Sequence, residues 1–134
     1  MGYTVRAIDI SQVAINQLKT IDVQGEGHIK AECIDLIEFQ ELHLFDYLLL
    51  DGFFHFNDHD LENEECYFNF IRTRSSERAK MVFCFANHGE AVRKFSQMTI
   101  GFRVIYQKHI SYQYFDRISE LTFETDYSLM VIQR

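Results

Sequence analysis

The sequence lacks proline altogether and has only three cysteines, Cys33, Cys66 and Cys84. An odd number of cysteines without a C-x-x-C pair is typical of a reducing, cytoplasmic setting rather than of a disulfide-stabilised secreted domain. Cys33 and Cys84 fall in apolar, strand-like runs, which predicts buried thiols. Proline commonly marks loops and turns, so its absence makes loop positions harder to predict, and it indicates no particular function.

Long apolar runs and a basic surface are also missing. No run approaches the roughly 18–20 apolar residues of a membrane span, and no signal peptide is visible. The formal net charge is −7, and the basic residues are scattered apart from one loose group between Arg72 and Lys80. Nucleic-acid binding relies on phosphate contacts with Lys and Arg. We therefore expect neither a membrane nor a nucleic acid as partner.

Apolar side chains, in contrast, are plentiful. Of the 134 residues, 47% are hydrophobic, and 13 are Phe and 7 are Tyr. This content is ample for a packed core and argues against disorder. No internal repeat, low-complexity stretch or linker divides the sequence. A single domain over residues 1–134 is therefore expected.

Apolar periodicity predicts strands alternating with helices over most of the chain. The strands are expected at residues 3–10, 28–33, 45–51 and 80–86, and the helices at 13–19, 61–74 and 88–98, with a short helix or turn at 37–42. The run 45–51 is continuously apolar, as in a central parallel strand covered on both faces. Three further strand-like runs, 102–106, 110–115 and 127–132, favour antiparallel pairing at one sheet edge. The fold class is therefore α/β, with a Rossmann-like, doubly wound, mostly parallel sheet and an antiparallel C-terminal edge.

The most informative motif lies at residues 4–11, TVRAIDIS. A short apolar strand ends in Asp9, and Ser11 follows as the N-cap of a helix. In nucleoside-binding α/β domains, a carboxylate at this place accepts hydrogen bonds from ribose hydroxyls.

Four segments taken in order resemble the class I S-adenosylmethionine-dependent methyltransferases. They are residues 2–11 with Ala14 and Ile15, 33–36, 45–52 and 126–132. The first and third look like the acid after the family's first motif and its fourth-strand motif. Residues 55, 56, 60 and 64 also resemble a small bacterial branch of the family. The resemblance implies S-adenosylmethionine as cofactor, S-adenosylhomocysteine as product, and methyl transfer to an acceptor. The acidic surface and short chain favour a small-molecule acceptor.

The resemblance also implies roles for single residues. Asp9 would bind the ribose diol, and Ile10 would pack on one face of the adenine. Asp35 would accept a hydrogen bond from the adenine amino group, with the backbone of Leu36 beside it. These residues follow strand ends, where open α/β sheets bind their ligands.

The methionine end of the cofactor is implied at the strand 45–51. Asp51 and Gly52 would lie near the transferred methyl group. Phe53, Phe54 and His55 would line the way to the acceptor, with His55 as candidate general base because an imidazole titrates near neutrality.

The sequence departs from the family at its start, because the first strand and its Gly-rich turn have no match. Gly25 and Gly27 come after the first helix. The family strand order, 3-2-1-4-5-7-6, would then be left with two strands on one side of a gap and four on the other. A second copy or another polypeptide could supply the pairing, as in a homodimer. Alternatively, strands 3–10 and 45–51 could pair directly, or the chain is an N-terminally truncated fragment.

Simpler interpretations stay open beside these. Asp9, Asp35 and Asp51 could merely end strands or cap helices. His55, Asp58, His59 and Asp60 could suggest a metal, but a polar helix entry with Asp58 or Asp60 as N-cap is the better interpretation. Tyr106, Tyr112, Tyr114 and Phe115 are core or interface, and an exposed patch there would be a dimer surface. The whole chain could be a non-catalytic, methyltransferase-like interaction protein or, less well supported, an NAD-binding oxidoreductase.

Overall fold

The protein is described here from a computed structural model that covers residues 3–21, 27–116 and 119–134. Gly2 and Gly25 therefore lie outside the described residues, as does most of the expected loop after the first helix. The chain divides into two compact units, Met1–Gln40 and Glu41–Arg134. The single domain over residues 1–134 stays a prediction. No helix in the described ranges is long and apolar enough to cross a membrane.

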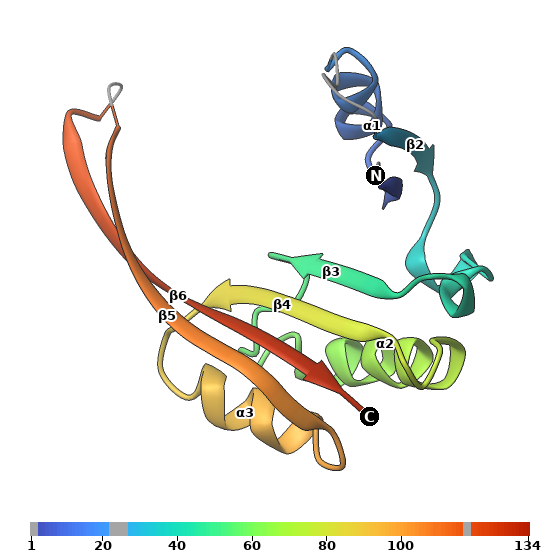
Figure 1. Cartoon of the computed structure of the whole chain (residues 1–134). Coiled ribbons are helices and arrows are strands. Elements are labelled where there is room, and N and C mark those ends of the chain that lie inside the picture. Colours follow the sequence, from blue (N-terminus) through green and yellow to red (C-terminus); the bar gives the residue numbers. More distant parts are fainter. Residues whose placement is uncertain (1–2, 22–26, 117–118) are drawn as a thin grey trace. The chain divides into compact units, whose positions relative to one another are not determined.

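The first unit is a parallel strand pair with one helix (Figure 1). Its elements are β1 (Thr4–Asp9), α1 (Gln12–Lys19), β2 (His28–Cys33) and the 3₁₀ helix η1 (Leu36–Glu38). Ser11 caps α1 as predicted, because its Oγ accepts the Ala14 N–H at 3.2 Å. Among the described residues of this unit, the buried apolar side chains are Ile15, Leu36 and Phe39. The β-α-β order expected for residues 3–33 is thus confirmed.

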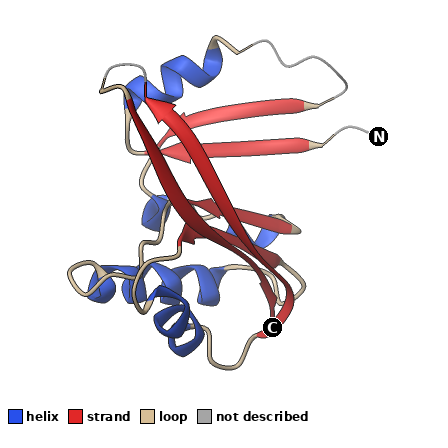
Figure 2. Cartoon of the chain, turned by 90° about the vertical axis from the view of Figure 1, so that its left-hand side faces the viewer, coloured by secondary structure: helices blue, strands red, loops and turns tan. Residues whose placement is uncertain are grey.

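The second unit contains a four-stranded sheet in the order β3-β4-β6-β5 (Figures 1 and 2). Its elements are η2 (Leu42–Leu44), β3 (Tyr47–Asp51), α2 (Leu61–Arg74), β4 (Lys80–Ala86), α3 (Ala91–Met98), β5 (Arg103–Asp116) and β6 (Leu121–Gln133). β3 and β4 are parallel, whereas β6 is antiparallel to both β4 and β5. The antiparallel C-terminal edge predicted from the sequence is therefore confirmed.

An aromatic core joins both helices of the second unit to one face of its sheet. Phe68 of α2 and Phe95 of α3 pack on Phe83 of β4, at ring-centroid distances of 6.2 and 5.2 Å. Phe85 of the same strand packs on Phe95 at 5.4 Å. Alternate residues of β4 point to this face, and Phe83 and Phe85 are at most 1% exposed. The core therefore lies between the sheet and the helices α2 and α3.

The exposure of side chains on the opposite face of this sheet contradicts the prediction made for the strand at residues 45–51. Leu49 is 70% exposed and Tyr47 58% exposed, whereas Leu48 and Leu50 are buried. β3 is also an edge strand of its sheet rather than a central one. The prediction of a central strand covered on both faces was wrong for the described residues, because an apolar run does not reveal which neighbours are present.

Smaller corrections concern the cysteines and the tail. Cys33 is exposed and Cys84 only half-buried, so the prediction of two buried thiols was wrong. The three strand-like runs predicted near the C-terminus form two long strands, because β5 continues through residues 107–109 with a register shift between Val104 and Tyr106. The expected short helix at 37–42 is two 3₁₀ turns, η1 and η2.

The division into sheets of two and four strands agrees with the gap expected from the sequence. Removing the first strand from the order 3-2-1-4-5-7-6 leaves 3-2 and 4-5-7-6, which are the neighbours seen here. In the described part of the chain, β1 and β3 belong to separate sheets, so they do not pair directly with each other.

Candidate functional site

Asp9 and Asp35 lie at the carboxyl ends of β1 and β2. Asp9 is the last residue of β1 and stands opposite Cys33, the last residue of β2. Asp9 Oδ1 accepts the Ser11 N–H at 2.6 Å, so the carboxylate orders the start of α1. A carboxylate has two oxygens with about four lone-pair sites, so this contact leaves capacity for a ligand hydroxyl. Because open α/β sheets bind ligands beyond the carboxyl ends of strands, this end of the pair is the candidate nucleoside site.

The residues around this strand end differ in exposure. Ile10 is 76% exposed, which suits an apolar surface that a ligand covers, and its carbonyl accepts the Cys33 thiol at 3.4 Å. Asp35 caps η1, since its Oδ1 accepts the Ile37 N–H at 3.2 Å. Leu36 is 8% exposed and packs in the core of this unit. Asp9 thus ends a strand and binds the N-cap residue of α1, and Asp35 caps η1; these local contacts do not conflict with a ligand role.

Asp51 and Gly52 end the edge strand β3 of the second unit. Gly52 has a φ of +62° and donates its N–H to the Cys84 carbonyl at 2.9 Å. The left-handed φ favours glycine at this turn. Burial of the Cys84 thiol, together with the neighbouring Asp51 carboxylate, raises the pKa of Cys84. The thiol therefore stays protonated at neutral pH.

The loop after Gly52 is fixed by two buried phenylalanines with His55 between them. Phe54 and Phe56 are each 1% exposed, whereas the side chain of His55 is 59% exposed. Phe54 packs on Phe83 and Phe56 on Phe85, at 5.3 and 4.7 Å between ring centroids. The φ of Phe56 is +54°, a left-handed value that is uncommon for a bulky residue. The structure thus presents an exposed imidazole on an ordered, strained loop.

Glu64 of α2 binds the backbone of this loop. Its role was not apparent from the sequence. Its Oε1 accepts the His55 N–H at 2.5 Å, and both its oxygens accept the Phe56 N–H, at 3.1 and 3.0 Å. Oε1 also lies 3.8 Å from His55 Nδ1. The Glu64 side chain is only 6% exposed. A signal existed, because Glu64 stands on the apolar stripe of α2 with Phe68 and Ile71, where a charged residue needs partners.

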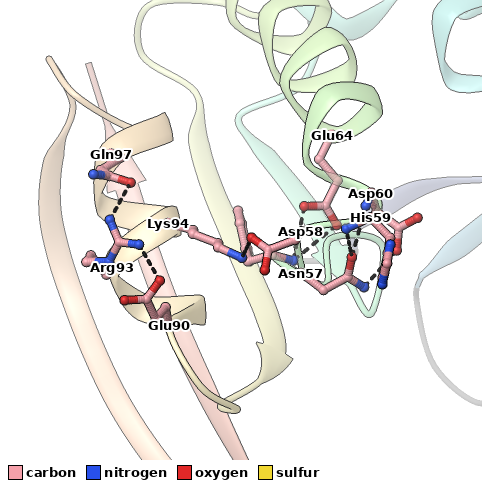
Figure 3. Close-up of polar contacts among 10 residues, drawn as sticks. Asn57, Asp58, His59, Asp60, Glu64, Glu90, Arg93, Lys94 and Gln97 are labelled. Atoms are coloured by element: carbon pink, nitrogen blue, oxygen red, sulfur yellow. Dashed lines mark hydrogen bonds and ion pairs between the residues drawn. The ribbon is translucent and has the colours of Figure 1, made fainter.

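The polar residues before α2 form a hydrogen-bonded turn. Asn57 Oδ1 accepts the N–H groups of His59 and Asp60, at 3.0 and 2.9 Å. Asp60 is the N-cap residue of α2 but its side chain makes no capping bond. Asp58 pairs instead with Lys94 of α3 at 2.5 Å (Figure 3). The prediction of Asp58 or Asp60 as N-cap is therefore confirmed for Asp60 by its position, although its side chain accepts no capping hydrogen bond. Among the described residues, no cluster of three or more His, Cys, Asp or Glu side chains could hold a metal ion.

A cavity of about 330 Å³ lies away from these groups. It is lined by residues from the end of α2, the start of β5 and the C-terminus, namely Arg72, Thr73, Ile100, Gly101, Phe102 and Arg134. These segments are at the amino ends of β4 and β5, opposite to the Asp51 end of the sheet. The cavity is therefore not part of the candidate site.

Comparison with known proteins gives a fold and no close relative. No protein-family model matches the chain. No curated protein matches it either. A solved structure of an S-adenosylmethionine-dependent methyltransferase from Anabaena variabilis is similar over 100% of this chain and 77% of its own, with a TM-score of 0.69 and 10% identity. TehB from Haemophilus influenzae matches 98% of this chain and 50% of its own, with a TM-score of 0.66 and 10% identity.

A third structure, the complex of LepI with S-adenosylmethionine, matches 97% of this chain and 36% of its own, with a TM-score of 0.60 and 10% identity. This chain thus spans half or less of the length of TehB and LepI, and about three quarters of the Anabaena protein. Likeness at such low identity establishes architecture. The chain has the Rossmann-like fold of the class I S-adenosylmethionine-dependent methyltransferases, as the sequence predicted.

Proposed function

We propose that this chain, with its class I methyltransferase fold, binds S-adenosylmethionine and directs its methyl group to a small-molecule acceptor. The observation that carries the proposal is the placement of Asp9, Asp35 and Asp51 at or just beyond the carboxyl ends of parallel strands, where this type of fold binds ligands. When bound, the sulfonium group supplies an electrophilic methyl, which the acceptor's lone pair attacks as the C–S bond breaks toward sulfur. The products are the methylated acceptor and S-adenosylhomocysteine.

The first unit is assigned the nucleoside half of the cofactor. Asp9 is an exposed carboxylate that suits the ribose diol through charge-assisted hydrogen bonds. The exposed side chain of Ile10 suits one face of the adenine, and Asp35 with the backbone of Leu36 suits its amino edge. These hydrogen-bond acceptors and the apolar side chain of Ile10 therefore fit a nucleoside.

The loop after β3 is assigned the acceptor side. Asp51 and Gly52 would lie near the methionine portion, with Phe53 and the exposed His55 facing the acceptor. His55 accepts the proton that an acceptor hydroxyl or amine loses on methylation. Glu64 holds the backbone of His55, which is the kind of positioning on which methyl transfer depends.

Each of the two sheets has an edge strand that a further strand would extend. β1 pairs only with β2, and β3 only with β4, among the described residues. A strand from a second copy or another polypeptide would satisfy backbone groups that are otherwise left to solvent.

Calorimetric titration of the purified chain with S-adenosylmethionine and S-adenosylhomocysteine tests the proposal. We expect saturable binding that is lost in Asp9→Ala. Asp9→Asn separates the two roles of this residue, because the amide oxygen still accepts the Ser11 N–H but loses the charge-assisted bonds to ribose. Glu124→Ala, which removes an exposed acid from β6, serves as control and should bind normally. Absence of binding at millimolar ligand by a folded chain would overturn the proposal.

A further inference from the structure

We propose that one face of the β5–β6 hairpin packs against the same face of a second copy of this chain, forming a homodimer. β5 and β6 pair along their whole length, from Arg103 opposite Gln133 to Asp116 opposite Leu121. β6 pairs with β4 only from Tyr127 to Ile132. Beyond Tyr127, in the described part of the chain, the hairpin is a two-stranded ribbon that extends past β4 (Figures 1 and 2). Such a ribbon is marginally stable in water without cover.

The register divides the hairpin into two unlike faces, because residues opposite each other in a ladder share a face and successive residues alternate. The aromatic face consists of exposed, large apolar side chains: Tyr106, Ile110, Tyr112, Leu121, Phe123 and Tyr127. The polar face of the ribbon carries Ser111, Gln113, Thr122, Glu124 and Asp126, with Phe115 as its one large apolar residue. The side chain of Tyr114 lies outside the described part. An amphipathic ribbon of this kind indicates that one face is meant to be buried.

The helices of the second unit do not cover the aromatic face. Met130 and Ser128 belong to the opposite face of β6 and are 2% and 0% exposed, since they lie opposite Phe83 and Phe85 of the helix-covered core. The aromatic face is thus continuous with the helix-free side of the sheet, on which Leu49 and Tyr47 are exposed.

The size of the aromatic face fits a protein partner. Its six side chains are between 37% and 57% exposed. At about 200 Å² for a large side chain, they present roughly 500–600 Å² of mainly apolar surface. This is the upper end of what a monomer exposes in one patch. With its polar surroundings, the patch approaches the ~800 Å² that each partner contributes to a stable interface.

The charges on this face favour a second copy over an unrelated partner. Lys108 lies between Tyr106 and Ile110, and Asp116 lies at the far end of β5 beyond Tyr112. When two such faces pack antiparallel about a two-fold axis, Lys108 of each copy approaches the partner's Asp116. A two-fold interface requires a self-complementary surface, and a basic and an acidic end on either side of an apolar centre provide one.

The test is the oligomeric state of the whole chain, measured by sedimentation equilibrium and light scattering. We expect a dimer in the wild type and a monomer in the double variant Tyr112→Asp, Phe123→Asp. The matched control is Gln113→Asp, Thr122→Asp, which places the same charges on the polar face of the same strands and should stay dimeric. Circular dichroism on each variant shows whether it is folded.

A charge exchange gives a second test that does not depend on removing apolar groups. Lys108→Asp and Asp116→Lys should each weaken the dimer by roughly tenfold, and the two together should restore it to within about threefold of wild type. A monomeric wild type at 100 µM would overturn the proposal, whether the aromatic face is then found open or covered by residues 1–40. The proposal would also be overturned if the polar-face variant Gln113→Asp, Thr122→Asp were monomeric while the aromatic-face variant stayed dimeric. None of these measurements involves a cofactor, so the outcome is separate from that of the proposed function.

Discussion

Single residues around α2 and α3 place charge in the protein interior, and each charge has a partner. Glu64 is buried and accepts two backbone N–H groups of the loop that carries His55. Lys94 is 8% exposed and pairs with the exposed Asp58. Buried charges are costly unless they are paired. Both pairs join the loop after β3 to helices of the core, so they serve to order this loop.

The Asp58–Lys94 pair predicts a pH dependence of stability. The hydrogen bond and charge of Lys94 lower the pKa of Asp58 below its ordinary value of 3.8. A carboxyl group with a depressed pKa in the folded state stabilises fully above its ordinary value, and this contribution is lost as the pH falls through the folded-state pKa. We expect Asp58→Asn to lower the free energy of unfolding at pH 7, with the difference from wild type disappearing as the pH falls below 3.8 and through the folded-state pKa of Asp58.

Two further variants test the cause of this effect. Lys94→Met removes the buried charge together with its pair, so it should destabilise less than Asp58→Asn, which leaves the ammonium buried and unpaired. Glu90→Gln breaks the Glu90–Arg93 pair, in which both side chains are more than half exposed, and should change little. Urea unfolding curves between pH 2 and 7 measure the free energy of unfolding of each variant. A Glu90 effect as large as that of Asp58 would contradict the explanation.

The sequence revealed local residue roles better than distant ones. Ser11 and its contact with Ala14 follow from neighbours in the chain, and so does the place of Asp9 at a strand end. The partners of Glu64 and Lys94 lie 8–9 and 36 residues away and depend on how the loop packs, so no local pattern identifies them. The exposure of Cys33 could not be predicted for the same reason. Its neighbours in sequence are apolar, but its strand ends at an exposed edge.

At the scale of elements, the start of α1 depends on its cap. Ser11 Oγ accepts the Ala14 N–H, and α1 is only eight residues long with Ile15 as its buried residue. We expect Ser11→Ala to reduce the local stability of α1 by about 1 kcal/mol, because an N–H group of the first turn loses its acceptor. Amide hydrogen exchange in α1 measures the change.

The control for this cap is Gln12→Ala in the first turn of the same helix. Gln12 makes an exposed side-chain bond to Asn16 and caps no backbone group. Since alanine has the higher helix propensity, exchange should be unchanged or slower. Equal acceleration by Gln12→Ala and Ser11→Ala would show that the cap has no special part in forming α1.

The β5–β6 hairpin shows the limit of predicting strands and helices from apolar periodicity. The strands 28–33 and 80–86 and the helix 61–74 were predicted with the bounds of β2, β4 and α2. In β4 and α2, apolar spacing reflects burial. Residues 107–109 and 121–126 are mostly polar and exposed, and they are strands because they pair with residues 128–130 and 111–116, respectively. Cross-strand pairing is a long-range interaction, so it leaves little trace in a single strand's composition.

For the whole molecule, the strand order was the best-predicted feature. The family order without its first strand gives the observed sheets of two and four strands. What could not be predicted is the division of the core between the two units. In the first unit, Ile15, Leu36 and Phe39 are the buried apolar residues, whereas the second contains the cluster around Phe83 and Phe95. The stability of the chain should therefore reside in residues 41–134.

This distribution makes a prediction for fragments. Residues 41–134 contain both core helices and the four-stranded sheet, so they should unfold cooperatively on heating at a temperature close to that of the full chain. Residues 1–40 should be largely unfolded when alone, because a parallel strand pair is stable only when both its faces are covered. Circular dichroism at 222 nm, recorded against temperature for the two fragments and the full chain, makes the comparison.

The fragment result also bears on how the candidate site is built. If residues 1–40 are unfolded alone, then Asp9 and Asp35 are held in place only when further structure covers the strands β1 and β2, so cofactor binding and folding of this unit are coupled. Addition of S-adenosylmethionine to the full chain should then slow hydrogen exchange in β1 and β2 more than in β4. A cooperative melting transition of residues 1–40 alone would contradict this view, since the nucleoside half of the site would then exist before any ligand binds.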